Sequence, residues 1–176
     1  LEKGSLTLEA AADILGDLFL YINSIEYIWG ADVRQLGQLR HKWNITLGGV
    51  DRDGNDAFNE LTHLILHVGG LVKVPEPALT FRWNKVTPRR ALLKALDTNR
   101  KIRGGSPQLE SDEHIISYLV DIGYPLEDAR CWFTQGCAAP VLDSPSHPIS
   151  CTTVSMFTNL ALSLDLALHN GVAPQT

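Results

Sequence analysis

Strand-like and helix-like segments alternate along the sequence, and this order limits the folds that the chain can adopt. A β-rich run at residues 43–47 ends in two glycines, and a helical pattern follows from about residue 56 to 68. The run ALTFRWN, residues 78–84, alternates like a strand and lies between prolines. A second helical pattern, residues 88–103, stops at the glycine pair that follows it. Strands that alternate with helices favour an α/β fold.

Three further helical patterns lie outside this alternation. Residues 8–29 have apolar positions at helical spacing and predict an amphipathic helix. Ser111 is expected to be the N-cap of a helix that ends before Gly123, and the last helix is expected to end at Gly171. Neither a repeat nor a low-complexity segment occurs, so residues 1–176 are interpreted as one piece of one domain.

Composition argues against several classes of partner. The net charge is −5, and the densest basic stretch, TPRRALLKALDTNRKIR, fits the solvated face of a helix, so no nucleic acid is expected. No apolar run reaches the roughly 18 residues of a membrane span, so no membrane association is expected. The three cysteines form no CxxC pair, which favours a reducing cytoplasm over a disulfide framework or a metal site.

The ends of the sequence indicate a piece of a longer protein. The chain begins with Leu1, and Met156 is its one methionine. We therefore expect an internal fragment that is inactive by itself.

Two motifs resemble metal sites but lack required ligands. In DRDGND the glycine is fourth rather than sixth, and Thr62 stands where a calcium loop needs glutamate. HLILH spaces His63 and His67 one helical turn apart, but Leu64 replaces the glutamate of the metalloprotease motif. We therefore expect a solvated turn, two ordinary histidines and no bound metal.

Cys137 stands between small residues in the stretch QGCAAPV. Gly136, Ala138 and Ala139 leave its sulfur unshielded, and Pro140 is expected to end any regular strand pairing because it has no N–H. This arrangement fits a reactive thiol presented at the tip of a tight loop. It also fits an ordinary turn with a buried, inert cysteine, and the residues alone leave both interpretations open.

A hydrolase that uses this thiol as a nucleophile is a further alternative. His147 or His114 could act as the base for Cys137, but the sequence reveals neither their contact nor an oxyanion hole. The glycine motifs that bind phosphates or dinucleotides are absent from the sequence. The hydrolase interpretation therefore ranks last.

Four longer stretches follow one another in the order and spacing of one enzyme family. They are NITLGGVDRDGNDAFNELTHLIL, VPEPALTFRWNKVTP, DEHIISYLVDIGYPLEDARCWFTQGCAAP and FTNLALSLDLALHNGVAPQT. In these stretches the chain resembles the glycyl radical enzymes, which include pyruvate formate-lyase, the diol and choline lyases, the arylacetate decarboxylases and the hydrocarbon-succinate synthases. The resemblance covers most of the chain and is weakest over residues 1–40.

The resemblance implies a fold and a chemistry. The chain would be part of a ten-stranded α/β barrel surrounded by helices, and Cys137 would lie on a loop inside that barrel. Gly136, Ala138, Ala139 and Pro140 would shape the loop. A glycyl radical stored near the C-terminus, outside this chain, would oxidise the thiol to a thiyl radical that abstracts a hydrogen atom from substrate. No cofactor would bind this chain directly.

The residues around Cys137 suggest a subclass within the family. In the dehydratases and the arylacetate decarboxylases a glutamate two residues after the cysteine serves as acid and base, and Ala139 stands there. Pyruvate formate-lyase has two adjacent cysteines, and Gly136 occupies the other place. Elimination favours an alkylsuccinate or benzylsuccinate synthase, which adds a hydrocarbon to fumarate. Trp132 with Phe133 suits an apolar substrate, and core packing is the alternative role for the two rings.

One departure from that subclass concerns the fumarate carboxylate. The synthases are expected to bind it with an arginine after the cysteine, and residues 131–176 contain none. Arg82 or Arg130 is the candidate replacement.

The resemblance also implies partners. A radical S-adenosylmethionine activating enzyme with an iron–sulfur cluster would install the glycyl radical, and the full chain would form a homodimer, with small accessory subunits as an option. Two alternatives remain: another reaction of the family, such as decarboxylation, dehydration or formate acetyl transfer, and an inactive homologue that serves as a binding subunit.

Overall fold

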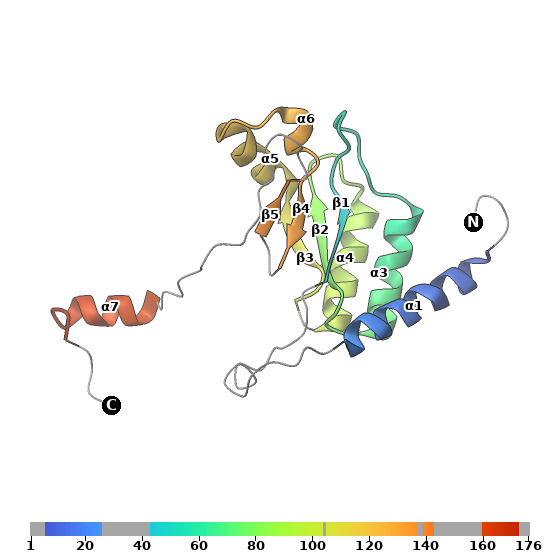
Figure 1. Ribbon diagram of the computed structural model, residues 1–176, viewed down its shortest axis with the longest axis horizontal. Coiled ribbons are helices and arrows are strands. Elements are labelled where there is room, and N and C mark those ends of the chain that lie inside the picture. The colour runs from blue at the N-terminus through green and yellow to red at the C-terminus, as the bar shows by residue number, and fades with distance from the viewer. Residues whose placement is uncertain (1–5, 26–42, 104, 137–138, 143–159, 173–176) are drawn as a thin grey trace.

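The centre of the fold is a three-stranded parallel sheet. A computed structural model describes residues 6–25, 43–103, 105–136, 139–142 and 160–172 of the chain. The sheet has the order β1-β2-β3 (Figure 1). Its strands are β1 (Asn44–Gly48), β2 (Ala78–Trp83) and β3 (Gln108–Ser111). The helices α3 (Glu60–Val72) and α4 (Arg89–Ile102) connect successive strands, as parallel neighbours require.

The two faces of this sheet differ in chemistry, because side chains alternate between the faces along each strand. Ile45 pairs with Leu79, and Leu47 pairs with Phe81, so apolar residues share one face. On the opposite face Thr46 pairs with Thr80, and polar side chains follow along both strands: Asn44, Thr46, Thr80 and Arg82. The apolar face therefore meets the helices, and the polar face is left for other parts of the chain.

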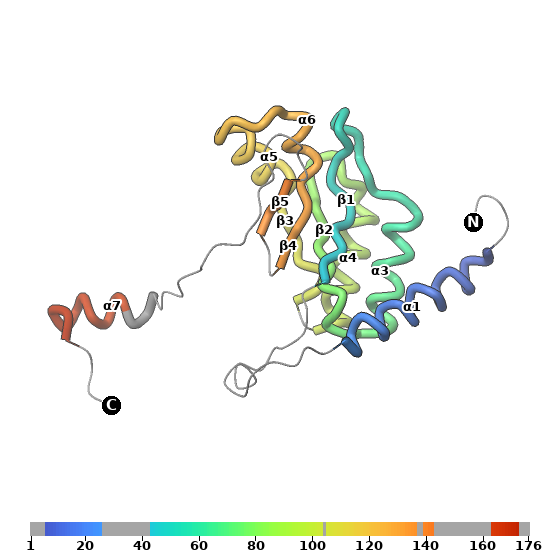
Figure 2. The backbone as a smooth tube through the Cα atoms, viewed as in Figure 1, coloured from blue at the N-terminus to red at the C-terminus, as the bar shows by residue number. Residues whose placement is uncertain are grey.

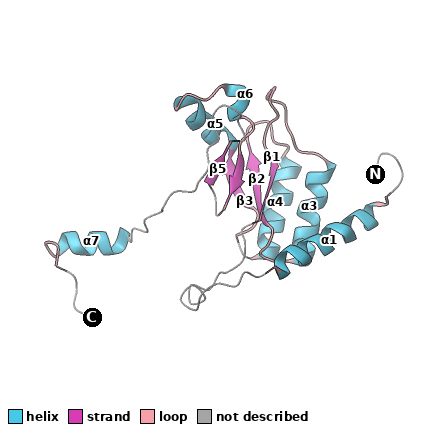
Figure 3. Cartoon of the chain, viewed as in Figure 1, coloured by secondary structure: helices cyan, strands magenta, loops and turns pink. Residues whose placement is uncertain are grey.

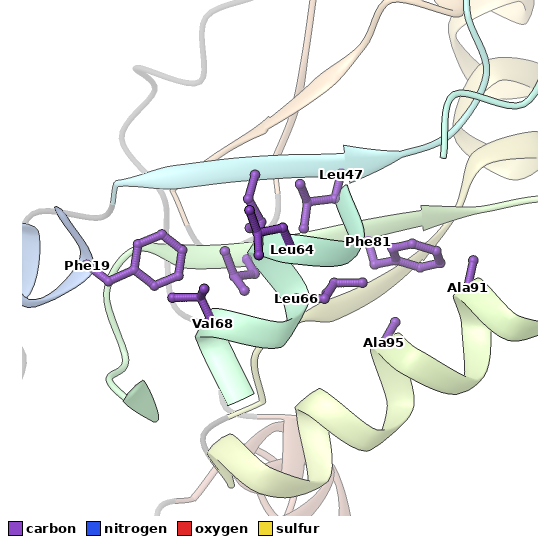
Figure 4. Packing of buried hydrophobic residues seen from close by; sticks show 10 residues of the cluster. Phe19, Leu47, Leu64, Leu66, Val68, Phe81, Ala91 and Ala95 are labelled. Atoms are coloured by element: carbon purple, nitrogen blue, oxygen red, sulfur yellow. The ribbon is translucent and has the colours of Figure 1, made fainter. Parts of the chain in front are cut away.

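The apolar core lies between the sheet and the helices α3 and α4 (Figure 4). Leu66 and Phe81 are completely buried in it, and Phe19 of α1 (Leu8–Ser24) covers its end. Burying a large apolar side chain contributes about 1.5–3 kcal/mol, so this cluster is the main source of stability in the described sheet. Figure 3 shows α1, α3 and α4 together beside the strands.

Several predicted elements are confirmed with small changes in their ends. The strand expected at 43–47 is β1, the strand expected at 78–84 is β2, and the helix expected at 88–103 is α4. The helix expected at 8–29 is described as α1 and ends at Ser24, and residues 26–42 lie outside the described part.

The helix expected at 56–68 is α3, which begins and ends four residues later. Asn59 is its N-cap, because its side chain accepts a hydrogen bond from the Thr62 N–H at 2.9 Å. The helix continues through Gly69 and Gly70, where it packs closely against its neighbours. A Cβ atom at Gly69 would lie 3.0 Å from a methyl group of Leu79.

In the described residues, three shorter helices follow the strands of the sheet along the chain. Ser111 is confirmed as the N-cap of α5 (Asp112–Asp121), and the short α6 (Leu126–Ala129) follows Pro125. The final helix α7 is described over Leu160–Leu168, within the segment expected to be helical. None of the described helices is both long and apolar enough to cross a membrane.

A two-stranded hairpin completes the described fold and was not predicted. Its strands β4 (Phe133–Gln135) and β5 (Ala139–Val141) pair antiparallel, and Figure 2 shows them side by side. The expectation that Pro140 ends the strand pairing is wrong, because Pro140 lies in β5 opposite Thr134. Among the described strands β5 pairs with β4 alone, and such an edge position tolerates a residue without an N–H.

Candidate functional site

Gly136, the residue that precedes Cys137, lies beside the polar face of the sheet. Gln135 pairs with Ala139, so Gly136, Cys137 and Ala138 are the whole connection between the two strands. Gly136 has a φ of 61°, a left-handed conformation that favours glycine. Cys137 and Ala138 themselves lie outside the described residues, so their predicted roles stay predictions.

Two side chains of β1 bind the backbone of the strand that leads to Cys137. The Asn44 Nδ2 atom donates a hydrogen bond of 2.8 Å to the Gly136 carbonyl oxygen. The Thr134 N–H donates one of 3.0 Å to the Thr46 Oγ1 atom. Both side chains come from the polar face of the sheet, so β4 is attached to β1 through side chains. The sequence shows this polar alternation in NITL, but not what the polar residues bind.

Arg82 of β2 is the centre of a buried network next to the hairpin. Its Nε and Nη2 atoms donate to the Asp112 Oδ1 atom at 2.8 and 2.6 Å, and Asp112 also accepts from the Trp132 Nε1 atom at 2.7 Å. The Arg82 Nη1 atom donates to the Trp132 carbonyl at 2.9 Å, and Nη2 donates to the Arg130 carbonyl at 2.7 Å. The Asn84 amide completes the set at 3.3 Å from Asp112.

This network binds most of the donors of the arginine. Four of the five N–H groups of a guanidinium are used by these contacts, and the Arg82 Cζ atom also lies 4.7 Å from the centre of the Trp132 ring. Burial lowers the pKa of Arg82 and the Asp112 carboxylate raises it, and the guanidinium remains charged at neutral pH.

Two of the residues suggested as substrate contacts, Trp132 and Arg82, are therefore internal in this structure. Trp132 is 1% exposed and belongs to an apolar cluster with Leu119, Ala129 and Leu142, and Arg82 is 6% exposed. Their contact with substrate is not tested by these positions, and it stays a prediction. Asp112 was not singled out from the sequence, because it is separated from Arg82 by thirty positions, which no local pattern connects.

A second charged group lies next to α6. Arg52 forms an ion pair of 2.9 Å with Asp128, and the Arg130 Nη1 atom donates to the Arg52 carbonyl at 2.8 Å. The hydrogen bond from Arg52 to Asp128 is the main cause that raises the pKa of Arg52. The guanidinium of Arg130, the other candidate for a fumarate carboxylate, is thus directed at the turn that contains Arg52.

The motifs that resemble metal sites have other partners. The Asp51 carboxylate accepts hydrogen bonds from the backbone N–H groups of Asp53 and Asn55, as in a simple polar turn, and hydrogen bonds from Asn55 lower the pKa of Asp51. The Nδ1 atom of His67 lies 3.3 Å from the Lys94 ammonium. Over the described ranges no group of three or more His, Cys, Asp or Glu side chains is placed to hold a metal ion.

The predicted hydrolase pair is not brought together by the described residues. His114 is exposed on α5, and His147 lies, like Cys137, outside the described part. The hydrolase interpretation thus gains no support from the described geometry.

Comparison with known proteins decides the family. The pyruvate formate lyase-like family matches the chain over residues 1–176. The chain belongs to this family, which is that of the glycyl radical enzymes. The predicted resemblance is therefore confirmed, and so is the fold class, an α/β portion of a glycyl radical enzyme barrel.

Several relatives of this pyruvate formate lyase-like chain have known activities. It is 28% identical to trans-4-hydroxy-L-proline dehydratase of Clostridioides difficile, over 98% of this chain and 22% of that protein. It is 30% identical to indoleacetate decarboxylase of Tractidigestivibacter scatoligenes, over 100% and 20% of the two proteins. The glycerol-bound B12-independent glycerol dehydratase from Clostridium butyricum has a similar structure, with a TM-score of 0.68 at 30% identity over 78% and 17% of the two chains.

These relatives bear on the subclass predicted from the sequence. The chain spans about a fifth of their length, and they are two dehydratases and a decarboxylase. None of the three adds a hydrocarbon to fumarate, so the fumarate-adding subclass has no support from them.

Proposed function

We propose that the chain is part of the catalytic subunit of a glycyl radical enzyme in which Cys137 abstracts a hydrogen atom from substrate. One observation supports this most directly. In a chain that matches the family over residues 1–176, the strands before and after Cys137 form a hairpin, and Asn44 binds the end of its first strand to the polar face of the sheet. A radical site requires such attachment, because hydrogen-atom transfer needs the donor and acceptor atoms nearly in contact.

The thiol would act by hydrogen-atom transfer, once with the glycyl radical and twice with the substrate. A glycyl radical elsewhere in the full protein would remove the hydrogen atom of the thiol and leave a thiyl radical. The Cys137 sulfur would then take a hydrogen atom from a substrate C–H bond, which forms an S–H bond and leaves a carbon radical. After the rearrangement the S–H bond would break and return a hydrogen atom to the product radical. The small neighbours of Cys137 would leave space for a substrate at the sulfur.

The residue at position 139 suggests which reactions suit this site. Ala139, at the start of β5, provides no acid or base at the place where the family resemblance implies a glutamate in the dehydratases and the decarboxylases. Chemistry by hydrogen-atom transfer alone therefore fits best, and addition of a hydrocarbon to fumarate is the proposed reaction. A lyase reaction, dehydration or decarboxylation, is the second candidate, because the relatives named above perform it.

An assay of the full-length protein separates the two candidates. The protein, activated by its own activating enzyme, is incubated with fumarate plus toluene or hexane, with indoleacetate, and with glycerol. We expect fumarate consumption that depends on the hydrocarbon, and no turnover in a Cys137→Ala variant. Cys131→Ala is the matched control, because it removes another thiol, six positions earlier in the chain. This variant is expected to keep full activity. Release of carbon dioxide or dehydration of glycerol instead would contradict fumarate addition and support the lyase.

The partners of the full protein are part of the same proposal. A radical S-adenosylmethionine activating enzyme would install the glycyl radical, and the catalytic chain would form a homodimer in the cytoplasm. A complete reading frame without a radical glycine would contradict the enzyme proposal and favour an inactive binding subunit.

A further inference from the structure

The backbone that leads to Cys137 is bound at every second residue by a side chain from the polar face of the sheet. Arg82 donates to the carbonyl groups of Arg130 and Trp132, at 2.7 and 2.9 Å. The next contacts along this backbone are the Thr134 N–H with Thr46 and the Gly136 carbonyl with Asn44, at 3.0 and 2.8 Å. The backbone groups at 130, 132, 134 and 136 are thus all fixed by side chains.

These side chains take the place of a backbone ladder. β4 pairs with β5 through backbone hydrogen bonds, but in the described sheet β1 pairs only with β2. Asn44 and Thr46 are two residues apart on β1 and therefore share a face. Asn44 and Thr46 are spaced like Gly136 and Thr134. The reason is that β1 and β4 are both extended strands, and Gly136 directly follows β4.

The contact with Asn44 acts on the peptide unit of the cysteine itself. The Gly136 carbonyl group, the nitrogen of Cys137 and the Cys137 Cα atom belong to one planar peptide unit. A hydrogen bond that fixes the carbonyl oxygen therefore restrains the position of the Cys137 Cα atom. Asn44 is 92 positions away in sequence, so local sequence analysis cannot find this contact.

We propose that Asn44 and Thr46 are positioning residues that set the place of the Cys137 thiol relative to the sheet. This inference rests on the proposed function of Cys137 in hydrogen-atom transfer. Transfer is highly sensitive to distance, and a misplacement of about 1 Å can reduce a rate about 100-fold. The two side chains act through the backbone, and neither has to touch the substrate.

A set of matched variants of the full-length protein tests the two hydrogen bonds. Thr46→Val keeps the shape of the side chain but removes the acceptor, whereas Thr46→Ser keeps the hydroxyl. Asn44→Asp keeps the shape and replaces the donating amide with a carboxylate that repels the Gly136 carbonyl at neutral pH. Ile45→Val is the packing control, because Ile45 lies on the opposite face of the same strand.

The first readout uses the protein before activation and needs no substrate. Hydrogen exchange of the peptide that covers residues 132–141 reports the opening of the hairpin. We expect exchange to become about fivefold faster in Thr46→Val and Asn44→Asp, the factor that loss of one hydrogen bond allows. Thr46→Ser and Ile45→Val are expected to remain within about twofold of wild type in this peptide.

The second readout uses activated protein and whichever substrate shows turnover in the assay above. At equal glycyl radical content, Thr46→Val and Asn44→Asp should lower kcat about tenfold or more and leave KM unchanged, because only the transfer step depends on thiol placement. Thr46→Ser should recover most of the wild-type kcat.

Two results would overturn the inference. One is wild-type exchange and wild-type kcat in both Thr46→Val and Asn44→Asp. The other is an equal loss in Thr46→Ser and Thr46→Val, which would assign the effect to packing. Failure of the proposed function would give a different result. The Cys137→Ala variant would retain turnover, and the rate of hydrogen exchange in the hairpin would have no bearing on that result.

Discussion

At the scale of single residues, the close approach of Arg82 explains a glycine that the sequence shows only as the end of a strand. Gly49 has a φ of 81°, and a Cβ atom there would lie 2.5 Å from the Arg82 Cζ atom. The guanidinium cannot move aside cheaply, because it is bound to Asp112 and to two backbone carbonyls. The position therefore has to be glycine for two reasons, its backbone conformation and the arginine beside it.

Replacing Gly49 should therefore cost more than replacing a glycine that has only the backbone constraint. Gly123 also has a positive φ, of 106°, but nothing lies within 4 Å of a Cβ atom there. We predict that Gly123→Ala lowers local stability by about 1–2 kcal/mol, and that Gly49→Ala lowers it by about 3 kcal/mol or more. Hydrogen exchange of the peptides that cover each site in the full-length protein measures both. Equal losses at the two sites would contradict the account of Gly49.

At the scale of elements, local patterns predicted the longer elements but not the ones that build the site. The strand β2 was recognised from its alternation and from the prolines around it, and the helix α4 from a helical pattern that stops at a glycine pair. The strands β4 and β5 have three residues each, which is too short for a period of two to be visible. Their docking depends on Asn44 and Arg82, whose partners are distant in sequence, so no local pattern could show it.

The buried pair of Arg82 and Asp112 should be the strongest link between these elements. It joins β2 to the start of α5, and the two side chains are 7% and 1% exposed. We predict that Asp112→Asn destabilises the hairpin region by about 3–5 kcal/mol, because a buried cation loses its counter-charge. The measurement is hydrogen exchange of peptides from β2 and from residues 130–136.

The neighbouring residue gives the control for this prediction. Glu113 pairs with Lys85 at 3.4 Å, and both side chains are exposed. Glu113→Gln should change the stability of the same peptides by less than about 1 kcal/mol. An Asp112→Asn protein as stable as Glu113→Gln would show that the buried pair does not hold β2, α5 and the hairpin together.

At the scale of the whole molecule, the described sheet is a portion of a larger barrel. The chain matches 22% and 20% of the length of two relatives, and among the described strands β3 has a partner on one side only. The family and the α/β fold could be predicted because long stretches of sequence have the family's order. The substrate could not, because the chain spans about a fifth of the length of its relatives and Cys137 lies outside the described residues.

The central claim, that Cys137 transfers hydrogen atoms, has a test that needs no substrate. The full-length activated protein is moved into heavy water, and the EPR doublet of its glycyl radical is followed over time. The Cys137 thiol exchanges its proton for a deuteron from solvent. If Cys137 then passes deuterium to the radical carbon and takes back a hydrogen atom, the coupling that splits the signal is lost. We predict that the doublet collapses in the wild type and persists in Cys137→Ala at equal radical content. Collapse at the wild-type rate in Cys137→Ala would contradict the account.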